Sequence, residues 1–430
     1  MDASLVIDHQ VHPGLGGDTV IRALLTISGT APSTTRPPLG LALVLDRSGS
    51  MDGAPLESAR DAAARAVQRL HPDDVVSTVL FDDKIETLAA PARCEAQHQL
   101  AERLRRVVAR GGTNLSGGWL RGRQHMEQAV TLLASEASSR RVVLLTDGCA
   151  NEGITDPDTL VELARTARTQ GITTTTIGVG EHYDDALLRA MADAGGGNAW
   201  HVESADHAQD VFAEELGSLL TVAAQNLTVT LTLHPDVEML VIHSDWPSVA
   251  NSGTISFDLG DLYASEPKPL LFEVLVPAQS VSVRAAVATL TIEAHVLTAE
   301  GGMELRVLSM PIAATLDGQS LMVPEVERAI LMARSAKARE EAARRQRDGD
   351  ALEAASLMSR AVDDISSSVL LREPAYANEL LRTSADLVRL EEKYREGGYS
   401  ELDAKYQMQR SYNERRGKRR YDSQLQRKDP

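Results

Sequence analysis

Aromatic side chains and cysteines are scarce in this chain. Phe, Trp and Tyr make up 3% of the 430 residues, and only two cysteines occur, Cys94 and Cys149. So few aromatics leave little surface on which bases could stack. Two cysteines far apart in the sequence do not form a disulfide framework. We therefore expect two reduced thiols, as in a cytoplasmic protein.

Targeting and membrane-spanning segments are lacking as well. The N-terminus has no basic stretch followed by an apolar run, so no secretory signal is visible. No apolar run approaches the roughly 20 residues that a membrane helix needs. These absences predict a cytoplasmic protein without a membrane span.

Common catalytic motifs are also missing. The only Gly-Lys pair, Gly417-Lys418, lies outside any nucleotide-binding loop. No Gly-x-Ser-x-Gly elbow and no His-Glu-x-x-His zinc motif occurs. His182 and His201 lie near expected strand ends, and we interpret both as surface or satisfied core residues. The net charge of −17 argues against non-specific nucleic-acid binding by the whole molecule, because phosphate contacts need a positive surface.

Residues 39–221 alternate continuous apolar runs with helical patterns. The runs are Leu41–Leu45, Val75–Phe81, Val142–Thr146 and Ile172–Val179. Such runs are typical of strands buried on both faces of a parallel sheet. Helix candidates between and after them are 56–70, Gln97–Ala109, Leu115–Ser135, Asp158–Thr169, Asp184–Ala194 and Asp206–Thr221. The alternation predicts an α/β domain with a doubly wound, mostly parallel sheet.

Residues 222–318 show a period of two instead. Alternating stretches lie at Leu227–Leu233, Ile255–Leu259, Leu270–Val276, Val281–Val296 and Met303–Val307. Between Val287 and Leu290 the apolar phase shifts, which indicates a bulge. Together the stretches predict an antiparallel β-sandwich. The N-terminal region, 1–38, holds one more alternating strand, Thr19–Ser28, which has no place in a parallel core. We therefore predict that it joins the sandwich and that the α/β domain is inserted there.

Residues 319–430 are predicted to be helical with a basic end. The helices expected are Val323–Arg347, Ala351–Val369, Pro374–Glu396 and a last one from Tyr399. The basic residues are Arg410, Arg415, Arg416, Lys418, Arg419, Arg420, Arg427 and Lys428. We interpret this end as a disordered solubilising tail, with contact to acidic partners or RNA as the alternative.

A polar loop follows the first buried run. The run ends at Asp46, and Ser48 and Ser50 follow at alternate positions. In open parallel sheets, ligands bind in the crevice at the carboxyl ends of the strands. Gly49 lets the loop turn tightly.

Over residues 39–220 the chain resembles von Willebrand factor type A domains, whose metal-ion-dependent adhesion site has this Asp-x-Ser-x-Ser loop. The family also requires a threonine in a later loop and an aspartate after a central strand. Thr113 in Gly-Gly-Thr-Asn and Asp147 in Thr-Asp-Gly match these positions. The resemblance implies a complete metal site of Asp46, Ser48, Ser50, Thr113 and Asp147. The domain order resembles that of bacterial cytoplasmic members.

The oxygen-rich set suits magnesium. Mg²⁺ prefers about six oxygen ligands and keeps several waters. The resemblance implies that the three hydroxyls ligate directly and that Asp46 and Asp147 act through waters. One position stays open, and in this family a carboxylate of the partner fills it. We predict Mg²⁺, with Mn²⁺ or Ca²⁺ as alternatives.

The loops nearby are open to two interpretations each. Asp82 and Asp83 either line the same rim or form a solvated turn, and Asn151 and Glu152 either border the site or are ordinary loop residues. Cys149 is interpreted as a small buried residue rather than a reactive thiol.

Three functions fit this sequence. The first is an adaptor that binds an exposed Asp or Glu of a partner protein through the metal, with an AAA+ ATPase as one candidate partner because some family members act beside such ATPases. The second is a Mg²⁺-dependent hydrolase, which lacks an obvious general base. The third is a scaffold assembled through the C-terminal helices, with the face at 325–347 as a partner surface. We expect a binding protein rather than an enzyme.

The predicted helix Asp206–Thr221 runs directly into the first strand of the predicted sandwich. We hypothesise that a shift of this helix transmits a change in the metal loop to the sandwich.

Overall fold

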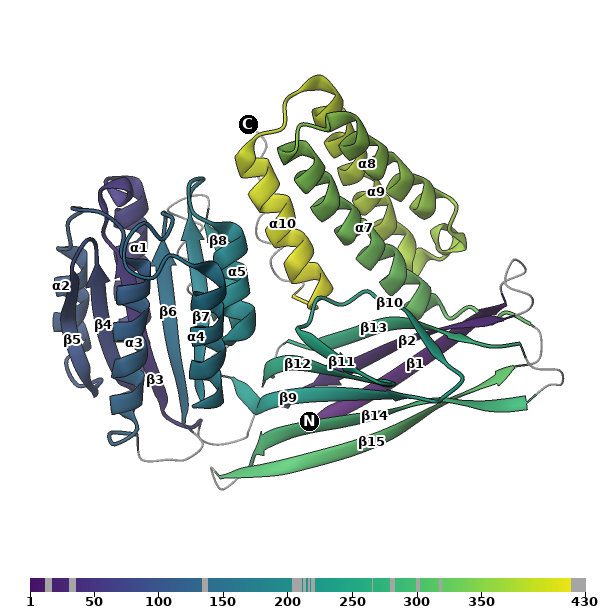
Figure 1. The fold of residues 1–430 in the computed structure, drawn as a ribbon, viewed down its shortest axis with the longest axis horizontal. Helices are drawn as coiled ribbons and strands as arrows, with labels where there is room; N and C mark the ends of the chain where they lie inside the picture. The colour runs from purple at the N-terminus through teal and green to yellow at the C-terminus, as the bar shows by residue number, and fades with distance from the viewer. Residues whose placement is uncertain are drawn as a thin grey trace.

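The chain forms three packed units: an α/β unit, two antiparallel sheets and a helical bundle (Figure 1). They are seen in a computed structural model. It describes residues 1–11, 18–30, 36–133, 138–202, 211, 214–215, 217, 221–264, 266–278, 283–298, 302–316 and 319–418. Most of the predicted helix Asp206–Thr221 and residues 419–430 of the predicted basic tail lie outside the described residues.

A six-stranded sheet forms the centre of the α/β unit, in the order β5-β4-β3-β6-β7-β8. Its strands are β3 (Leu39–Asp46), β4 (Val75–Phe81), β5 (Ile85–Arg93), β6 (Ser139–Thr146), β7 (Ile172–Val179) and β8 (Gly196–Val202). All neighbours are parallel except β5, which runs antiparallel to β4. The four apolar runs correspond to β3, β4, β6 and β7. The sequence does not predict β5 and β8, because β5 has no buried residue and β8 begins with two glycines.

Helices cover both faces of this sheet. They are α1 (Ala54–Gln68) and α2 (Gln97–Arg105) on one face, and α3 (Leu115–Ala129), α4 (Pro157–Thr169) and α5 (Asp185–Ala194) on the other. Successive strand residues point to opposite faces. Leu41 and Leu43 therefore pack with α1 and α2, and Ala42 and Val44 pack with the other group. The predicted mostly parallel α/β fold is confirmed.

Two antiparallel sheets share a second apolar core. One has the order β1-β2-β13-β10, with β1 (Asp2–Val11), β2 (Thr19–Ser28), β13 (Lys268–Val276) and β10 (Glu238–Ile242). The other has the order β11-β12-β9-β14-β15, with β11 (Ser248–Asn251), β12 (Thr254–Tyr263), β9 (Val222–Leu233), β14 (Val283–Leu297) and β15 (Met303–Leu316). Apolar side chains of both sheets meet in one cluster, as in a sandwich. The register of β14 shifts between Ala286 and Ala288, at the start of the interval where the sequence indicates a bulge.

The strand at Thr19–Ser28 pairs outside the parallel sheet. As β2 it runs antiparallel to β13, with Ile21 opposite Val274 and Leu25 opposite Leu270. The α/β unit therefore lies in the sequence between β2 and β9, which belong to the two antiparallel sheets.

Four helices follow the sheets. They are α7 (Pro324–Arg347), α8 (Ala351–Ser366), α9 (Pro374–Glu396) and α10 (Glu401–Arg415), with short 3₁₀ turns elsewhere at η2 (Gly49–Met51) and η3 (Val369–Arg372). Pro374 begins α9, and Gly349, with φ +85°, forms the turn before α8. Val326 and Ile330 of α7 pack on Leu24 and Leu271 of the sheets. Of the helices that the structure describes, none combines the length and the apolar character needed to cross a bilayer.

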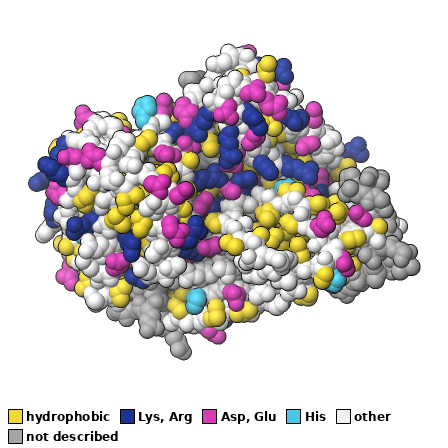
Figure 2. All heavy atoms as spheres, viewed as in Figure 1, with side chains coloured by type: hydrophobic (Ala, Val, Ile, Leu, Met, Phe, Trp, Pro, Cys, Tyr) yellow, Lys and Arg dark blue, Asp and Glu magenta, His cyan; other side chains and the backbone are white. Residues whose placement is uncertain are grey.

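The prediction of a solubilising tail is wrong for the first part of the basic segment. Arg416 is 5% exposed and pairs with Asp193 of α5, whereas Arg415 pairs with Asp245 and Glu340. Charged side chains of both signs gather where the bundle meets the other two units (Figure 2). The sequence shows that these charged residues are present, but it does not show that they are buried. Their burial follows from the packing of α10 against the α/β unit, which is a tertiary contact.

Candidate metal centre

The strand ends bring the first and last motif loops together. β3 ends at Asp46 and β6 ends at Thr146, and these strands are parallel neighbours with Leu45 opposite Leu145. The residues that follow each strand therefore emerge at the same edge of the sheet. The turn η2 then carries Ser50 back over this edge.

Asp46 is completely buried and held at both oxygens. Its Oδ1 accepts the Ser48 N–H at 2.7 Å, and its Oδ2 accepts the Thr146 hydroxyl at 2.5 Å. Burial raises the pKa of Asp46 to about 6, although these hydrogen bonds favour the ionised form. A carboxylate in this position is costly without a cation nearby.

The two serines and Asp147 form a row of oxygens. Ser48 Oγ lies 3.1 Å from Ser50 Oγ, and the Ser50 hydroxyl donates to Asp147 Oδ1 at 2.8 Å. Adjacent corners of an octahedron around Mg²⁺, with ligands about 2.1 Å from the ion, are about 3.0 Å apart. The spacing between Ser48 and Ser50 fits two neighbouring ligands of one small cation, and the hydrogen bond to Asp147 orients the Ser50 hydroxyl. Burial raises the pKa of Asp147 as well.

Thr113 is brought to the same place by its backbone. Its carbonyl oxygen accepts the N–H groups of Asn151 and Glu152, at 3.3 and 3.2 Å. A Cβ added to Gly148 would lie 3.3 Å from Thr113 Oγ1, so this hydroxyl lies beside the loop that follows Asp147. All five predicted residues therefore gather at one edge, and Asn151 and Glu152 border it.

The site depends on hydroxyls. Within the described ranges, no group of three or more His, Cys, Asp or Glu side chains is placed to hold a metal ion. The donor set is hard oxygen, with two carboxylates and three hydroxyls, which suits Mg²⁺ better than a soft metal.

The interpretation of a solvated turn is wrong for Asp82, whose side chain points inward, although Asp83 beside it is exposed. Asp82 is completely buried and accepts hydrogen bonds from Arg47 at 2.7 Å and Arg110 at 2.8 Å. Burial raises its pKa, but hydrogen bonds from Arg110, the Lys84 N–H and Arg47 outweigh this and lower it to about 2. Asp82 thereby ties the Asp46 loop to the Thr113 loop.

Gly111 is required in the Thr113 loop. Its φ is +73°, and an added Cβ would lie 2.1 Å from Asp83 Oδ1. Its carbonyl oxygen accepts the Gly49 N–H at 3.0 Å, which joins the Thr113 loop to the serine loop. A side chain at this position would push the two loops apart.

The thiol and histidines of this edge differ in exposure. Cys149 is exposed, contrary to the expectation of a small buried residue, and its Sγ lies 3.4 Å from the His182 carbonyl oxygen. His182 is exposed, whereas His201 is buried and its Nδ1 is 2.7 Å from the Tyr183 hydroxyl. His182 thus matches a surface residue and His201 a core residue.

Thr146 is a candidate functional residue that the motif does not include. It is buried, and its hydroxyl orients Asp46 while its Oγ1 accepts the Gly148 N–H at 3.1 Å. A polar residue at the last position of an otherwise apolar run is the signal that could have identified it.

Comparison with known proteins supports the fold of this unit. Residues 41–214 match the family model of the von Willebrand factor type A domain. An uncharacterized protein from Synechocystis sp. is 29% identical over 65% of this chain and 69% of its own. Inter-alpha-trypsin inhibitor heavy chain H4 from Bos taurus is 29% identical over 52% of this chain, but the match spans only 26% of that protein.

Two solved structures resemble nearly the whole chain. A von Willebrand factor type A protein from Catenulispora acidiphila has a TM-score of 0.67 at 19% identity, covering 89% of each chain. The ArnB paralog VWA2 from Sulfolobus acidocaldarius has a TM-score of 0.57 at 17% identity, covering 97% of this chain and 98% of its own. These similarities concern the fold alone.

Proposed function

Since this chain contains a von Willebrand factor type A domain, we propose that it is an adaptor that binds a protein partner through a divalent cation, Mg²⁺. Ser48, Ser50 and Thr113 would ligate the ion with their hydroxyls. Asp46 and Asp147 would hold its waters and balance its charge. The proposal rests on the row of oxygens from Ser48 to Asp147, with spacings of 3.1 and 2.8 Å.

The bound ion would act as a Lewis acid with an open position. Hydroxyl ligands are neutral and leave most of the ionic charge available to an incoming carboxylate. An exposed Asp or Glu of the partner is therefore the ligand we propose, and Mn²⁺ or Ca²⁺ could replace Mg²⁺. Ser50 is exposed whereas Asp46 is buried. A partner would therefore meet the site at Ser50.

We also propose that the chain binds rather than catalyses, and that it acts in the cytoplasm. Asp82 cannot serve as a general base beside the site, because its pKa of about 2 makes it a very weak base and two guanidinium groups occupy it. Assays with phosphate and carboxylate esters in Mg²⁺ test this. Turnover that disappears in Asp46→Ala would overturn the binding interpretation.

The direct test combines metal titration with partner capture. Mn²⁺ binding is measured by calorimetry on wild type, Asp46→Ala and the matched control Asp158→Ala, whose side chain is exposed on α4. Immobilised protein is then used to capture partners in Mg²⁺ and in chelator. We expect wild type and control to bind Mn²⁺ and to retain a partner only in Mg²⁺, and Asp46→Ala to do neither. Equal retention by Asp46→Ala, or in chelator, would contradict the proposal.

A further inference from the structure

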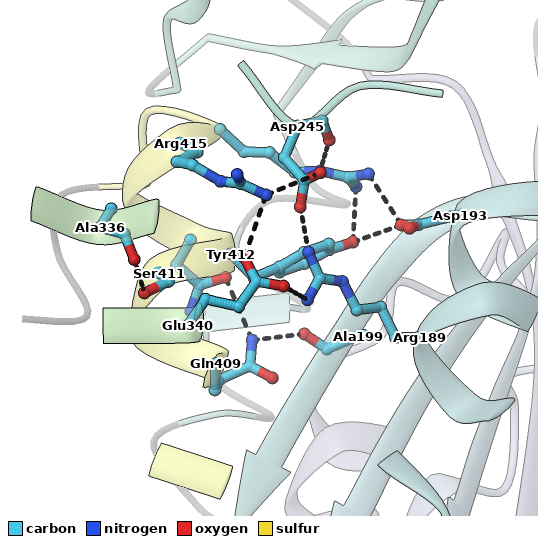
Figure 3. A network of polar contacts seen from close by, with 12 residues as sticks. Arg189, Asp193, Ala199, Asp245, Ala336, Glu340, Gln409, Ser411, Tyr412 and Arg415 are labelled. Atoms are coloured by element: carbon cyan, nitrogen blue, oxygen red, sulfur yellow. Dashed lines mark hydrogen bonds and ion pairs between the residues drawn. The ribbon is translucent and has the colours of Figure 1, made fainter. Parts of the chain in front are cut away.

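The last helix is anchored on the edge of the α/β unit. The Gln409 side chain donates to the Ala199 carbonyl at 2.8 Å, and the Tyr412 hydroxyl donates to Asp193 at 2.7 Å. Arg189 of α5 reaches Glu340 of α7 at 3.1 Å (Figure 3). These contacts are polar and partly buried. Those of Gln409 and Tyr412 position α10 against β8 and α5, and that of Arg189 positions α7 beside them.

Lys405 is the residue of α10 that reaches toward the strand ends. Its side chain is only 3% exposed, and its Nζ donates to the Tyr183 carbonyl at 2.6 Å. Nζ also lies 3.8 Å from the centre of the Tyr183 ring and 3.7 Å from Asp185 Oδ1. A buried ammonium group needs such partners. Because these partners are Tyr183 and Asp185, Lys405 fixes the end of the segment that joins β7 to α5.

This segment lies beside the proposed metal loop. β7 is the parallel neighbour of β6, with Gly178 opposite Thr146, so their following loops emerge side by side. The contact between Cys149 Sγ and the His182 carbonyl joins the two loops directly. His182 is the residue before Tyr183, whose carbonyl Lys405 holds.

Tyr183 has little freedom to move. Its ring packs over Gly178, where an added Cβ would lie 2.2 Å from a ring carbon, and its hydroxyl is bonded to His201. A displacement of the Tyr183 backbone would have to disturb this packing. The path from Lys405 to Cys149 therefore runs through a closely packed segment rather than a loose loop.

We propose that Lys405 is a positioning residue for the metal site. Through Tyr183 and His182 it holds the loop of Asp147 and Cys149, so docking of α10 sets the affinity for the cation. This inference rests on the proposed function for its metal readout. The helix α10 would thus influence metal binding, although it lies outside the α/β unit that holds the proposed ligands.

The test uses the full chain with Lys405→Met, which removes the ammonium and keeps the aliphatic stem. We expect faster amide exchange at His182–Leu187 and Cys149–Asn151, and weaker Mn²⁺ binding by about tenfold, as for other residues that support ligands. Lys393→Met is the matched control, because its Nζ lies 3.2 Å from Asp403 in the bundle and its side chain is 43% exposed. It should leave both quantities unchanged.

The outcomes separate this inference from the proposed function. If wild type binds no Mn²⁺, the proposed function fails, while exchange at Cys149–Asn151 still decides whether Lys405 positions the loop. Unchanged exchange there, or unchanged Mn²⁺ affinity in a variant whose exchange has risen, would overturn the inference. If Lys405→Met does not fold, Arg347→Met replaces it, because Arg347 bonds Asp185 at 3.2 Å and is 29% exposed. The same rise in exchange and a smaller loss of affinity are then expected.

Discussion

Arg141 of β6 and Asp261 of β12 form a buried ion pair of 3.1 Å between the α/β unit and the antiparallel sheets. The Arg141 side chain is completely inaccessible, and it also donates to Glu215 at 3.0 Å and to the Tyr263 hydroxyl at 2.8 Å. Buried charges are tolerated only when they are paired in this way. The two units are therefore joined by a polar contact. Breaking it would either expose Arg141 and its acidic partners to water or leave them buried without a partner.

Replacement of Arg141 by Met should strongly destabilise the chain. Glu215 and Asp261 would remain buried without their cation, at a cost of roughly 3–5 kcal/mol. Urea unfolding measures the difference. Arg165→Met, which removes an exposed arginine, serves as the control and should change the free energy of unfolding very little. A stability of Arg141→Met equal to that of the control would show that the pair contributes nothing.

Thr146→Val should weaken metal binding without touching a predicted ligand. Asp46 Oδ2 would lose its hydroxyl donor, and residues that orient ligands usually contribute about 10- to 100-fold to metal affinity. Mn²⁺ titration measures the effect. Thr169→Val removes a hydroxyl at the exposed end of α4 and should bind as wild type does. Equal affinity in both variants would mean that Thr146 does not orient Asp46.

Stability should depend on Asp82 in a defined pH window. Its pKa is about 2 in the folded chain, below the value of about 3.9 for an unfolded aspartate. The ionised form therefore stabilises the fold above about pH 4, and this contribution is lost as the pH falls toward 2. We expect the difference in unfolding free energy between wild type and Asp82→Asn to be on the order of 3 kcal/mol at pH 7.

That difference should shrink as the pH falls from 5 to about 2, as urea unfolding at each pH would measure. Asp73→Asn is the control, because Asp73 is exposed and its pair with Arg93 is 3.5 Å long. A difference for Asp82→Asn that stays constant with pH would rule out its charge as the cause.

The two thiols should react at very different rates. Cys149 is exposed, whereas Cys94 is buried, and burial raises the pKa of Cys94 to about 12. A thiol reagent at pH 8 should therefore modify one cysteine per chain quickly and the second only after unfolding. Cys149→Ser should abolish the fast phase. A fast phase that survives this substitution would contradict the observed burial of Cys94.

Local patterns in the sequence predict much of the α/β unit. Val75–Phe81 and Ile172–Val179 have the same bounds in the sequence pattern and in the structure, because both are buried at every position and contain only apolar residues, Ser, Thr and Gly. Edge strands lack this signature, so β5 and β8 are not predicted. Four of the five motif residues come together because the ends of the parallel strands β3 and β6 share one edge, a rule that needs only strand order. Thr113 lies between α2 and α3 and is placed by tertiary hydrogen bonds to Asn151 and Glu152.

Charged residues are where sequence reasoning fails. Asp82 and Arg416 have the composition of solvated loops and tails, yet both are buried in ion pairs. Asp82 pairs with Arg47, 35 positions away, and Arg416 pairs with Asp193, 223 positions away. Nothing in the periodicity around either residue indicates such a partner.

The sequence by itself therefore determined most of the strands and helices of the α/β unit and the five residues of the proposed site, because periodicity and turn residues report local burial. Only the tertiary structure decided which charges are buried and which helix contacts the segment beside the proposed site. Lys405 reaches Tyr183 across 222 positions because α10 packs on the α/β unit. Such contacts depend on how complete helices and strands pack together, and the periodicity of the sequence does not indicate that packing.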